Sequence, residues 1–95
     1  MVLYGEARIE KFAKQHAASR KPLSRFVEIV RTAEWRHLPD VKATFPGTDY
    51  LAESQAYVFN IGGNKCRLVA AIDFDQQIVL IEAVMTHEQY NRKDL

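Results

Sequence analysis

The chain has 95 residues, of which 47% are apolar and 26% are charged, and its formal net charge is +1. These values are ordinary for one soluble globular domain, so we expect residues 1–95 to form a single domain. They exclude a protein that is basic throughout, which means that any contact with a nucleic acid must rest on a local patch.

Several features that are absent from the sequence limit where the protein is expected to be located and which kinds of site it is expected to have. No apolar run approaches the roughly 20 residues that span a membrane, and residues 1–12 lack the layout of a secretion signal. Cys66 is the only cysteine, which excludes an internal disulfide and is typical of a reducing compartment. The three histidines lie far apart, so no zinc site is expected. We predict a cytoplasmic protein without membrane contact, metal or cofactor, and a packed Cys66 thiol.

Two amphipathic helices are predicted in the first third of the chain. Residues 1–4 are apolar enough to add a strand. Residues 7–19 then carry Ile9 and Phe12 at helical spacing, and residues 23–34 repeat the pattern with Phe26 and Val30. Pro22 suits the first turn of the second helix. His16 lies near the end of the first helix, where a partly buried structural histidine explains it better than a functional one.

Residues 35–46 are predicted to be irregular and residues 47–55 to form a turn with a short edge strand near Tyr50 and Leu51. The simplest role for Trp35 is to anchor the helix pair to the sheet edge. Lys42 stands between Val41 and Phe45 in this segment. Taken alone, Lys42 is typical of a surface lysine.

The segment 57–90 predicts an antiparallel meander of three strands with a polar tail. Apolar residues alternate on both sides of the turn at residues 62–65, and residues 78–85 are nearly all apolar. The alternation sets Phe59 opposite Leu68, Asn60 opposite Arg67, Arg67 opposite Met85, and Phe74 opposite Ile78. This register places Arg67 at the same end of the sheet as His87 and Tyr90.

An arginine, a histidine and a tyrosine at one sheet end suit phosphodiester chemistry. Arginine offers a fork for phosphate, histidine transfers protons near neutrality, and tyrosine stacks on a base or donates a proton. The same three residues are also consistent with a surface cluster that has no catalytic role. The residue types alone leave both readings open.

Three segments resemble the HigB-type toxins of bacterial type II toxin–antitoxin systems, in the RelE-like mRNA interferase superfamily: WRHLPDVKATFPGTD, YVFNIGGNKCRLVAAIDF and IVLIEAVMTHEQY. The resemblance implies a ribosome-dependent endoribonuclease that cuts mRNA in the ribosomal A site. It also implies a HigA-type helix-turn-helix antitoxin, and contact with operator DNA only through the toxin–antitoxin complex.

The resemblance also implies site residues. Arg67 matches the arginine that contacts the scissile phosphate, His87 stands in the TH motif, Tyr90 matches the aromatic residue beyond it, and Lys42 matches a basic position. We therefore expect Arg67, His87, Tyr90 and Lys42 to be catalytic. We expect RNA contacts from Lys65, which also matches a basic position, and from Asn64 and Arg92.

One departure from the family favours a second hypothesis. Relatives commonly carry a basic residue in the last strand where this chain has Glu82, and a carboxylate repels phosphate unless it points away or acts as a base. The alternative is a weak or degenerate toxin that serves as partner and co-repressor of an antitoxin.

The fold is predicted to be α+β, with an N-terminal helix hairpin on one face of a twisted antiparallel sheet of three to four strands (RelE-like). Arg67 and His87 are predicted to be largely exposed. The predicted core is listed here in full: Ile9, Phe12, Phe26, Val30, Phe59, Ile61, Leu68, Ile72, Leu80 and Val84.

Overall fold

The computed structural model of the chain describes residues 1–63 and 65–92, without the side chain of Arg92. The elements in chain order are β1 (Val2–Tyr4), α1 (Glu6–Gln15), the 3-10 turn η1 (Ala17–Ser19), α2 (Arg20–Thr32), α3 (Leu38–Thr44), β2 (Asp49–Leu51), β3 (Ala56–Ile61), β4 (Cys66–Asp73), β5 (Ile78–Thr86) and α4 (His87–Arg92). The predicted α+β class is confirmed.

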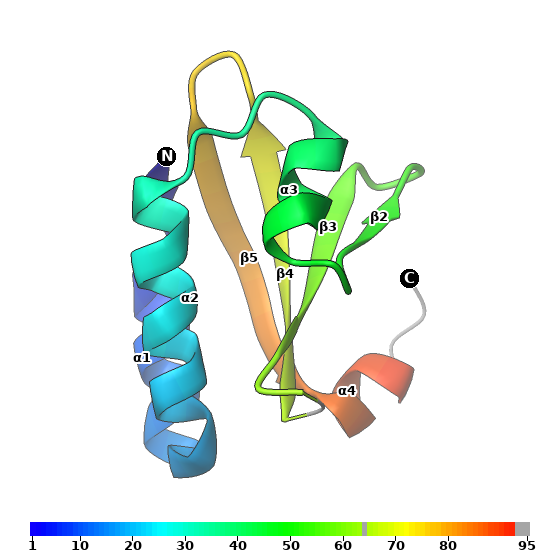
Figure 1. The fold of residues 1–95 in the computed structure, drawn as a ribbon. Coiled ribbons are helices and arrows are strands. Elements are labelled where there is room, and N and C mark those ends of the chain that lie inside the picture. The colour runs from blue at the N-terminus through cyan, green and yellow to red at the C-terminus, as the bar shows by residue number, and fades with distance from the viewer. Residues whose placement is uncertain (64, 93–95) are drawn as a thin grey trace.

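The sheet has five strands in the order β1-β5-β4-β3-β2, rather than the predicted three to four. β1 is parallel to β5, so the sheet is mixed, and the other pairings are antiparallel. The two outer strands are the segments expected near residues 1–4 and near Tyr50. In Figure 1, α1 and α2 lie side by side along one flank, and α3 stands in front of β3 and β4.

The predicted first helix is shorter than expected. α1 ends at Gln15, η1 follows, and α2 begins at Arg20, so Pro22 falls in the first turn of α2. Proline is tolerated there because the first N–H groups of a helix have no intrahelical acceptor.

The prediction that residues 35–46 are irregular is wrong, because α3 occupies Leu38–Thr44. Pro39 stands in the first turn of α3, and the carboxylate of Asp40 accepts a hydrogen bond from the backbone N–H of Arg36 at 2.8 Å. These local contacts fix the start of a helix whose seven residues are too few to show helical periodicity clearly.

Trp35 has the anchoring position that the sequence predicted. Its ring stacks with that of Phe59 and meets Phe45 edge-on, and its indole N–H donates to Thr44 Oγ1 at 3.0 Å. The backbone carbonyl of Trp35 accepts a hydrogen bond from Gln77 at 2.6 Å. The segment between α2 and α3 is thereby fixed to the sheet.

The predicted register between β3 and β4 is confirmed. Phe59 lies opposite Leu68, and Asn60 lies opposite Arg67. Gly62 and Gly63 open the connecting turn with φ values of 61° and 72°, a backbone region that favours glycine. The faces of the two strands are therefore those that the period of two predicts.

The register between β4 and β5 is correct at one end and wrong at the other. Arg67 lies opposite Met85 as predicted, but Ile78 lies opposite Asp73 and not Phe74. The pairs Val69–Ala83 and Ala70–Ile81 leave Glu82 as an extra residue in β5, which is a β-bulge. One extra residue reverses which side chains of the strand face the core.

The bulge explains why the side chain of Leu80 is exposed. It was predicted to be core, but it is 44% exposed, while its neighbours Val79 and Ile81 are buried. The other predicted core residues lie inside or at the edge of the core: Ile9, Phe12, Phe26, Val30, Phe59, Ile61 and Leu68 are buried, and Ile72 and Val84 are half-buried against them.

The sheet has two unlike faces. We call the face that α1, α2 and α3 cover the helix face; its main buried side chains include Phe26, Phe59 and Leu68. The other face, which we call the open face, has a smaller buried group that includes Val58, Val69 and Met85, with Tyr90 of α4 packed on it. Arg67 alternates with Leu68 in β4 and so belongs to the open face. Within the described residues, no helix is long and apolar enough to cross a membrane.

Candidate active site where β4, β5 and α4 meet

A reciprocal cap fixes the start of α4. The backbone N–H of Gln89 donates to Thr86 Oγ1 at 3.0 Å, and the backbone N–H of Thr86 donates to Gln89 Oε1 at 2.9 Å. This is the capping box of the sequence T-x-x-Q, which satisfies two N–H groups that a helix start leaves free. The cap holds His87 in the first turn of the helix, at the end of β5.

The structure brings Arg67, His87 and Tyr90 together, as the strand register predicted. Arg67 Nη2 donates to His87 Nε2 at 2.8 Å, and the guanidinium carbon lies 4.8 Å from the centre of the Tyr90 ring. A guanidinium over an aromatic ring at this distance forms a cation–π contact. Two contacts from α4, three residues apart on the same side of the helix, therefore hold the arginine in place.

The hydrogen bond with Arg67 sets the role of one ring nitrogen of His87. An arginine can only donate, so Nε2 of His87 is the acceptor in this contact. The amide nitrogen of Asn91 lies 3.2 Å from Nδ1 of the same ring. His87 is thus held from both sides, with its basic nitrogen toward Arg67.

The three side chains are half-buried, which corrects the prediction that Arg67 and His87 are largely exposed. α4 lies over the end of the open face, in a segment that the sequence pattern predicts to be a polar tail. The Nε of Arg67 is enclosed and has no hydrogen-bond partner among the described residues. A buried donor left in this way costs about 1–3 kcal/mol and is often found at functional sites.

The other predicted site residues lie elsewhere or outside the described residues. Lys42 is exposed on α3, which packs on the helix face, whereas Arg67 is on the open face. Lys65 Nζ donates to the carbonyl of Ala18 at 3.4 Å, so its ammonium is directed toward η1. Asn64 lies outside the described residues. Arg92 is the last residue of α4, and its side chain is also outside them.

Glu82 lies in a cleft of about 300 Å³ between α1 and β5. The cleft is also lined by Arg8 and Lys11 of α1 and by Gln89 of α4. Glu82 is exposed there, beside two cationic side chains. The lining of the cleft therefore combines the carboxylate of Glu82 with the cationic side chains of Arg8 and Lys11.

His16 and Cys66 have the structural roles that were expected of them. His16 follows α1, is half-buried, and stacks on Phe12 with ring centres 4.1 Å apart. Cys66 is fully buried, and this burial raises the pKa of its thiol, although a hydrogen bond with Ser19 acts in the opposite direction. Within the described residues, no group of three or more His, Cys, Asp or Glu side chains is arranged to hold a metal ion.

Sequence reasoning missed Asn91. The signal for it was present in T-H-E-Q, because this capping box predicts a helix that starts at His87. Residues four apart in a helix lie on the same side, which places Asn91 beside His87.

Comparison with known proteins shows that most of the chain matches a known protein family. The model of the family described as "HigB_toxin, RelE-like toxic component of a toxin-antitoxin system" matches residues 19–93, which include all of α2 to α4. The chain is 46% identical over 54 residues to the mRNA interferase toxin HigB of Escherichia coli strain K12, an alignment that covers 54% of this chain.

The chain spans about half the length of the first curated relatives it matches, since the same alignment covers 50% of the K12 protein. An mRNA interferase HigB from Escherichia coli O6:H1 is 20% identical over 93 residues, which cover 97% of this chain and 90% of that protein. This second relative is less similar in sequence, but its alignment covers nearly the full length of both proteins.

Proposed function

The chain belongs to the HigB toxin family, and from this premise we propose that it is the toxin of a type II toxin–antitoxin module that cleaves mRNA. The observation that supports this most directly is the hydrogen bond from Arg67 to His87, beside Tyr90. The proposal includes cleavage on the ribosome, in the A site, because the relatives are named mRNA interferases and the sequence resembles ribosome-dependent members.

The proposed reaction is attack of an RNA 2′-hydroxyl on the adjacent phosphorus. The 2′ oxygen forms a bond to phosphorus and gives its proton to a base, while the bond to the 5′ oxygen breaks and that oxygen receives a proton from an acid. The products are a 2′,3′-cyclic phosphate and a 5′-hydroxyl. The protein must supply proton transfer and a cation for the dianionic phosphorane.

Arg67 and His87 are suited to these two tasks. The guanidinium of Arg67 donates to phosphate oxygens, and such charge-assisted hydrogen bonds are stronger than neutral ones. When phosphate engages Arg67, the lone pair on His87 Nε2 is released and becomes available for a proton. Tyr90 would then stack on a neighbouring base or donate a proton. The unpaired Nε of Arg67 supports the assignment, because phosphate oxygens are acceptors for such a donor.

The proposal names partners as well as a reaction. A HigA-type helix-turn-helix antitoxin would neutralise the toxin, and operator DNA would be bound only through their complex. Lys65, Asn64 and Arg92 would contact RNA, whereas Lys42, on α3 at the helix face, would take no part in the step at Arg67. A ribosomal target places the protein in the cytoplasm, and residues 1–95 would act as one domain.

The substitution Arg67→Ala tests the proposal. Cleavage of mRNA on programmed ribosomes should fall by about 10²–10³, the usual loss when a donor to transition-state charge is removed. Arg36→Ala, which removes an arginine outside the site, is the matched control and should cleave like the wild type. Melting temperature shows whether each variant folds. Cleavage that survives both Arg67→Ala and His87→Gln unchanged would refute the assignment.

Glu82 favours the second candidate function, a degenerate toxin that acts only as antitoxin partner and co-repressor. Glu82 lines the cleft between α1 and β5, and Gln89 of α4 lines the same cleft. Expression of the chain without an antitoxin separates the two candidates, because an active toxin arrests growth. Full viability with abundant folded protein would select the degenerate form.

A further inference from the structure

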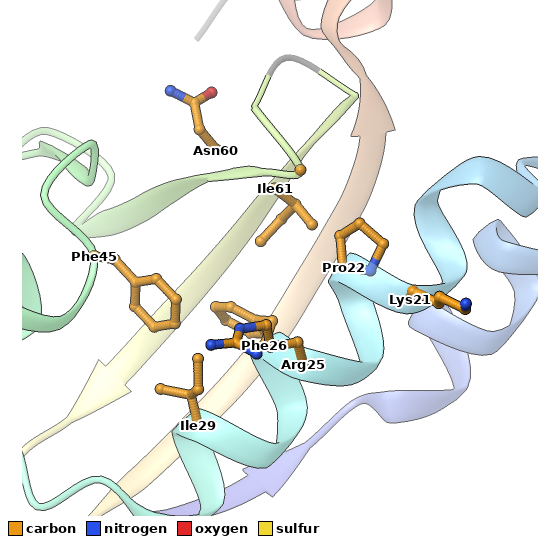
Figure 2. Close-up of a pocket in the computed structure, with 9 residues that line it drawn as sticks. Lys21, Pro22, Arg25, Phe26, Ile29, Phe45, Asn60 and Ile61 are labelled. Carbon is orange, nitrogen blue, oxygen red and sulfur yellow. The ribbon is translucent and has the colours of Figure 1, made fainter.

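A hollow of about 440 Å³ lies on the helix face, between α2 and the end of β3 (Figure 2). This volume is within the range of about 300–1,000 Å³ that is typical of ligand pockets. The described residues that line it are Lys21, Pro22, Arg25, Phe26, Ile29, Phe45, Asn60, Ile61 and Gly62. The site proposed for RNA cleavage uses none of them.

The hollow exists because β2 is shorter than β3. β2 pairs only with residues 56–58, so the last residues of β3 have β4 on one side and no strand of the described sheet on the other. α2 and Phe45 stand on either side of this uncovered end. At one end the turn closes on α2, since a Cβ at Gly62 would lie 3.1 Å from the ring of Pro22.

The interior of the hollow is apolar. Phe26 and Ile61 are buried at its floor, and Ile29 and Phe45 are half-buried at its walls. In Figure 2 the side chains of Ile29, Phe45 and Ile61 point toward the same space, while Asn60 points away from it. Such a surface favours an apolar side chain inserted from a partner.

The rim of the hollow is cationic. Lys21 and Arg25 are exposed on α2, and none of the nine described lining residues is acidic. The stem of Lys65 approaches the same turn, with its Cδ 3.1 Å from a Cβ built at Gly62. An apolar floor with a cationic rim is complementary to an amphipathic segment that carries apolar anchors flanked by carboxylates.

We propose that this hollow is the docking site for an acidic amphipathic segment of the antitoxin, an inference that rests on the partner named in the proposed function. A protein segment fits better than RNA, because the floor offers aliphatic and edge-packed aromatic side chains. The hollow also opens on the helix face, whereas Arg67 is on the open face. RNA that reaches Arg67 therefore has no need to enter it.

The test measures the affinity of the purified chain for the helix-turn-helix protein encoded beside it, by calorimetry. Arg25→Glu reverses the rim charge at an exposed position and should weaken binding by about tenfold or more, with a smaller effect at high salt. Ile29→Arg keeps the rim basic but fills the apolar wall, and should weaken binding by a similar factor, with melting temperature as the folding check. Lys14→Glu on α1 makes the same charge change away from the hollow and should bind within about twofold of the wild type.

Cleavage on programmed ribosomes is measured for the same variants and should stay at the wild-type level. Arg25→Glu with unchanged antitoxin affinity overturns the inference, and so does a loss of cleavage without a loss of affinity, which would assign the rim to RNA. Self-association through the hollow in place of antitoxin binding also overturns it. Wild-type chain that cleaves mRNA but binds no antitoxin refutes the docking site and leaves the enzyme intact. Chain that binds at the hollow without cleaving refutes only the enzyme.

Discussion

The two faces of the sheet are built from the same strands but differ in what they bury. On the helix face, Phe59 and Leu68 are fully buried among the side chains of three helices. On the open face, their chain neighbours Asn60 and Arg67 pair across the same two strands. Arg67 is only half-buried there, under one short helix.

This difference assigns separate tasks to the two faces. Close packing on the helix face supplies the free energy of folding, because apolar burial is the main favourable contribution. The open face keeps an arginine partly desolvated and an Nε–H without a partner, a cost that the helix face must offset. Substitutions on the open face should therefore change activity without changing stability. Substitutions on the helix face should change stability without changing activity.

The largest expected effect is that of His87→Gln on the open face. Glutamine keeps a polar side chain but cannot exchange a proton near neutral pH, so cleavage on programmed ribosomes should fall by about 10²–10⁴. The free energy of unfolding should change by about 1 kcal/mol or less, since the half-buried site lies outside the main core.

A double variant sharpens this test. If Arg67 and His87 serve one transition state, the loss in Arg67→Ala/His87→Gln should be clearly smaller than the product of the single losses. Independent, multiplying effects would contradict a shared site. A destabilisation of several kcal/mol by His87→Gln would contradict the separation of the two faces.

The next effect is that of Leu68→Ala on the helix face. Leu68 is fully buried, so its truncation should lower the free energy of unfolding by about 2–5 kcal/mol through lost burial and a cavity. Denaturant unfolding measures this loss. Cleavage per folded molecule should stay near the wild-type value, because the side chain points away from Arg67. A fall in specific cleavage as large as that of Arg67→Ala would show that the faces are coupled.

The sequence predicted the face of Arg67 but not its surroundings. Strict alternation around Gly62 and Gly63 defined the β3–β4 register, and this was enough to bring Arg67 near His87. The half-burial of Arg67 depends on α4, whose six residues are too few for helical periodicity to predict a helix. The capping box of Thr86 and Gln89 is the sequence signal that does predict it.

The bulge at Glu82 was not predictable from the same pattern. Residues 78–85 are apolar at nearly every position, so a shift of one residue leaves the pattern almost unchanged, and no glycine marks the irregularity. Gly5, with φ of 90°, approaches the backbone of Ile81 so closely that a Cβ there would lie 2.6 Å from its carbonyl oxygen. That contact is a tertiary one, between segments about 75 residues apart, and local sequence rules do not address it.

The smallest expected effect is that of Leu80→Ala, and it tests the bulge. Because Leu80 is 44% exposed, its truncation should lower the free energy of unfolding by less than about 1 kcal/mol. Ile81→Ala is the matched control one residue away. Ile81 is 1% exposed on the helix face, so the control should cost about 2–5 kcal/mol. Urea titrations of both variants, compared at equal m-values, give the two costs directly. An unbroken β5 register would exchange the two residues between faces, so a larger cost for Leu80 than for Ile81 would remove the bulge and return Glu82 to the regular ladder.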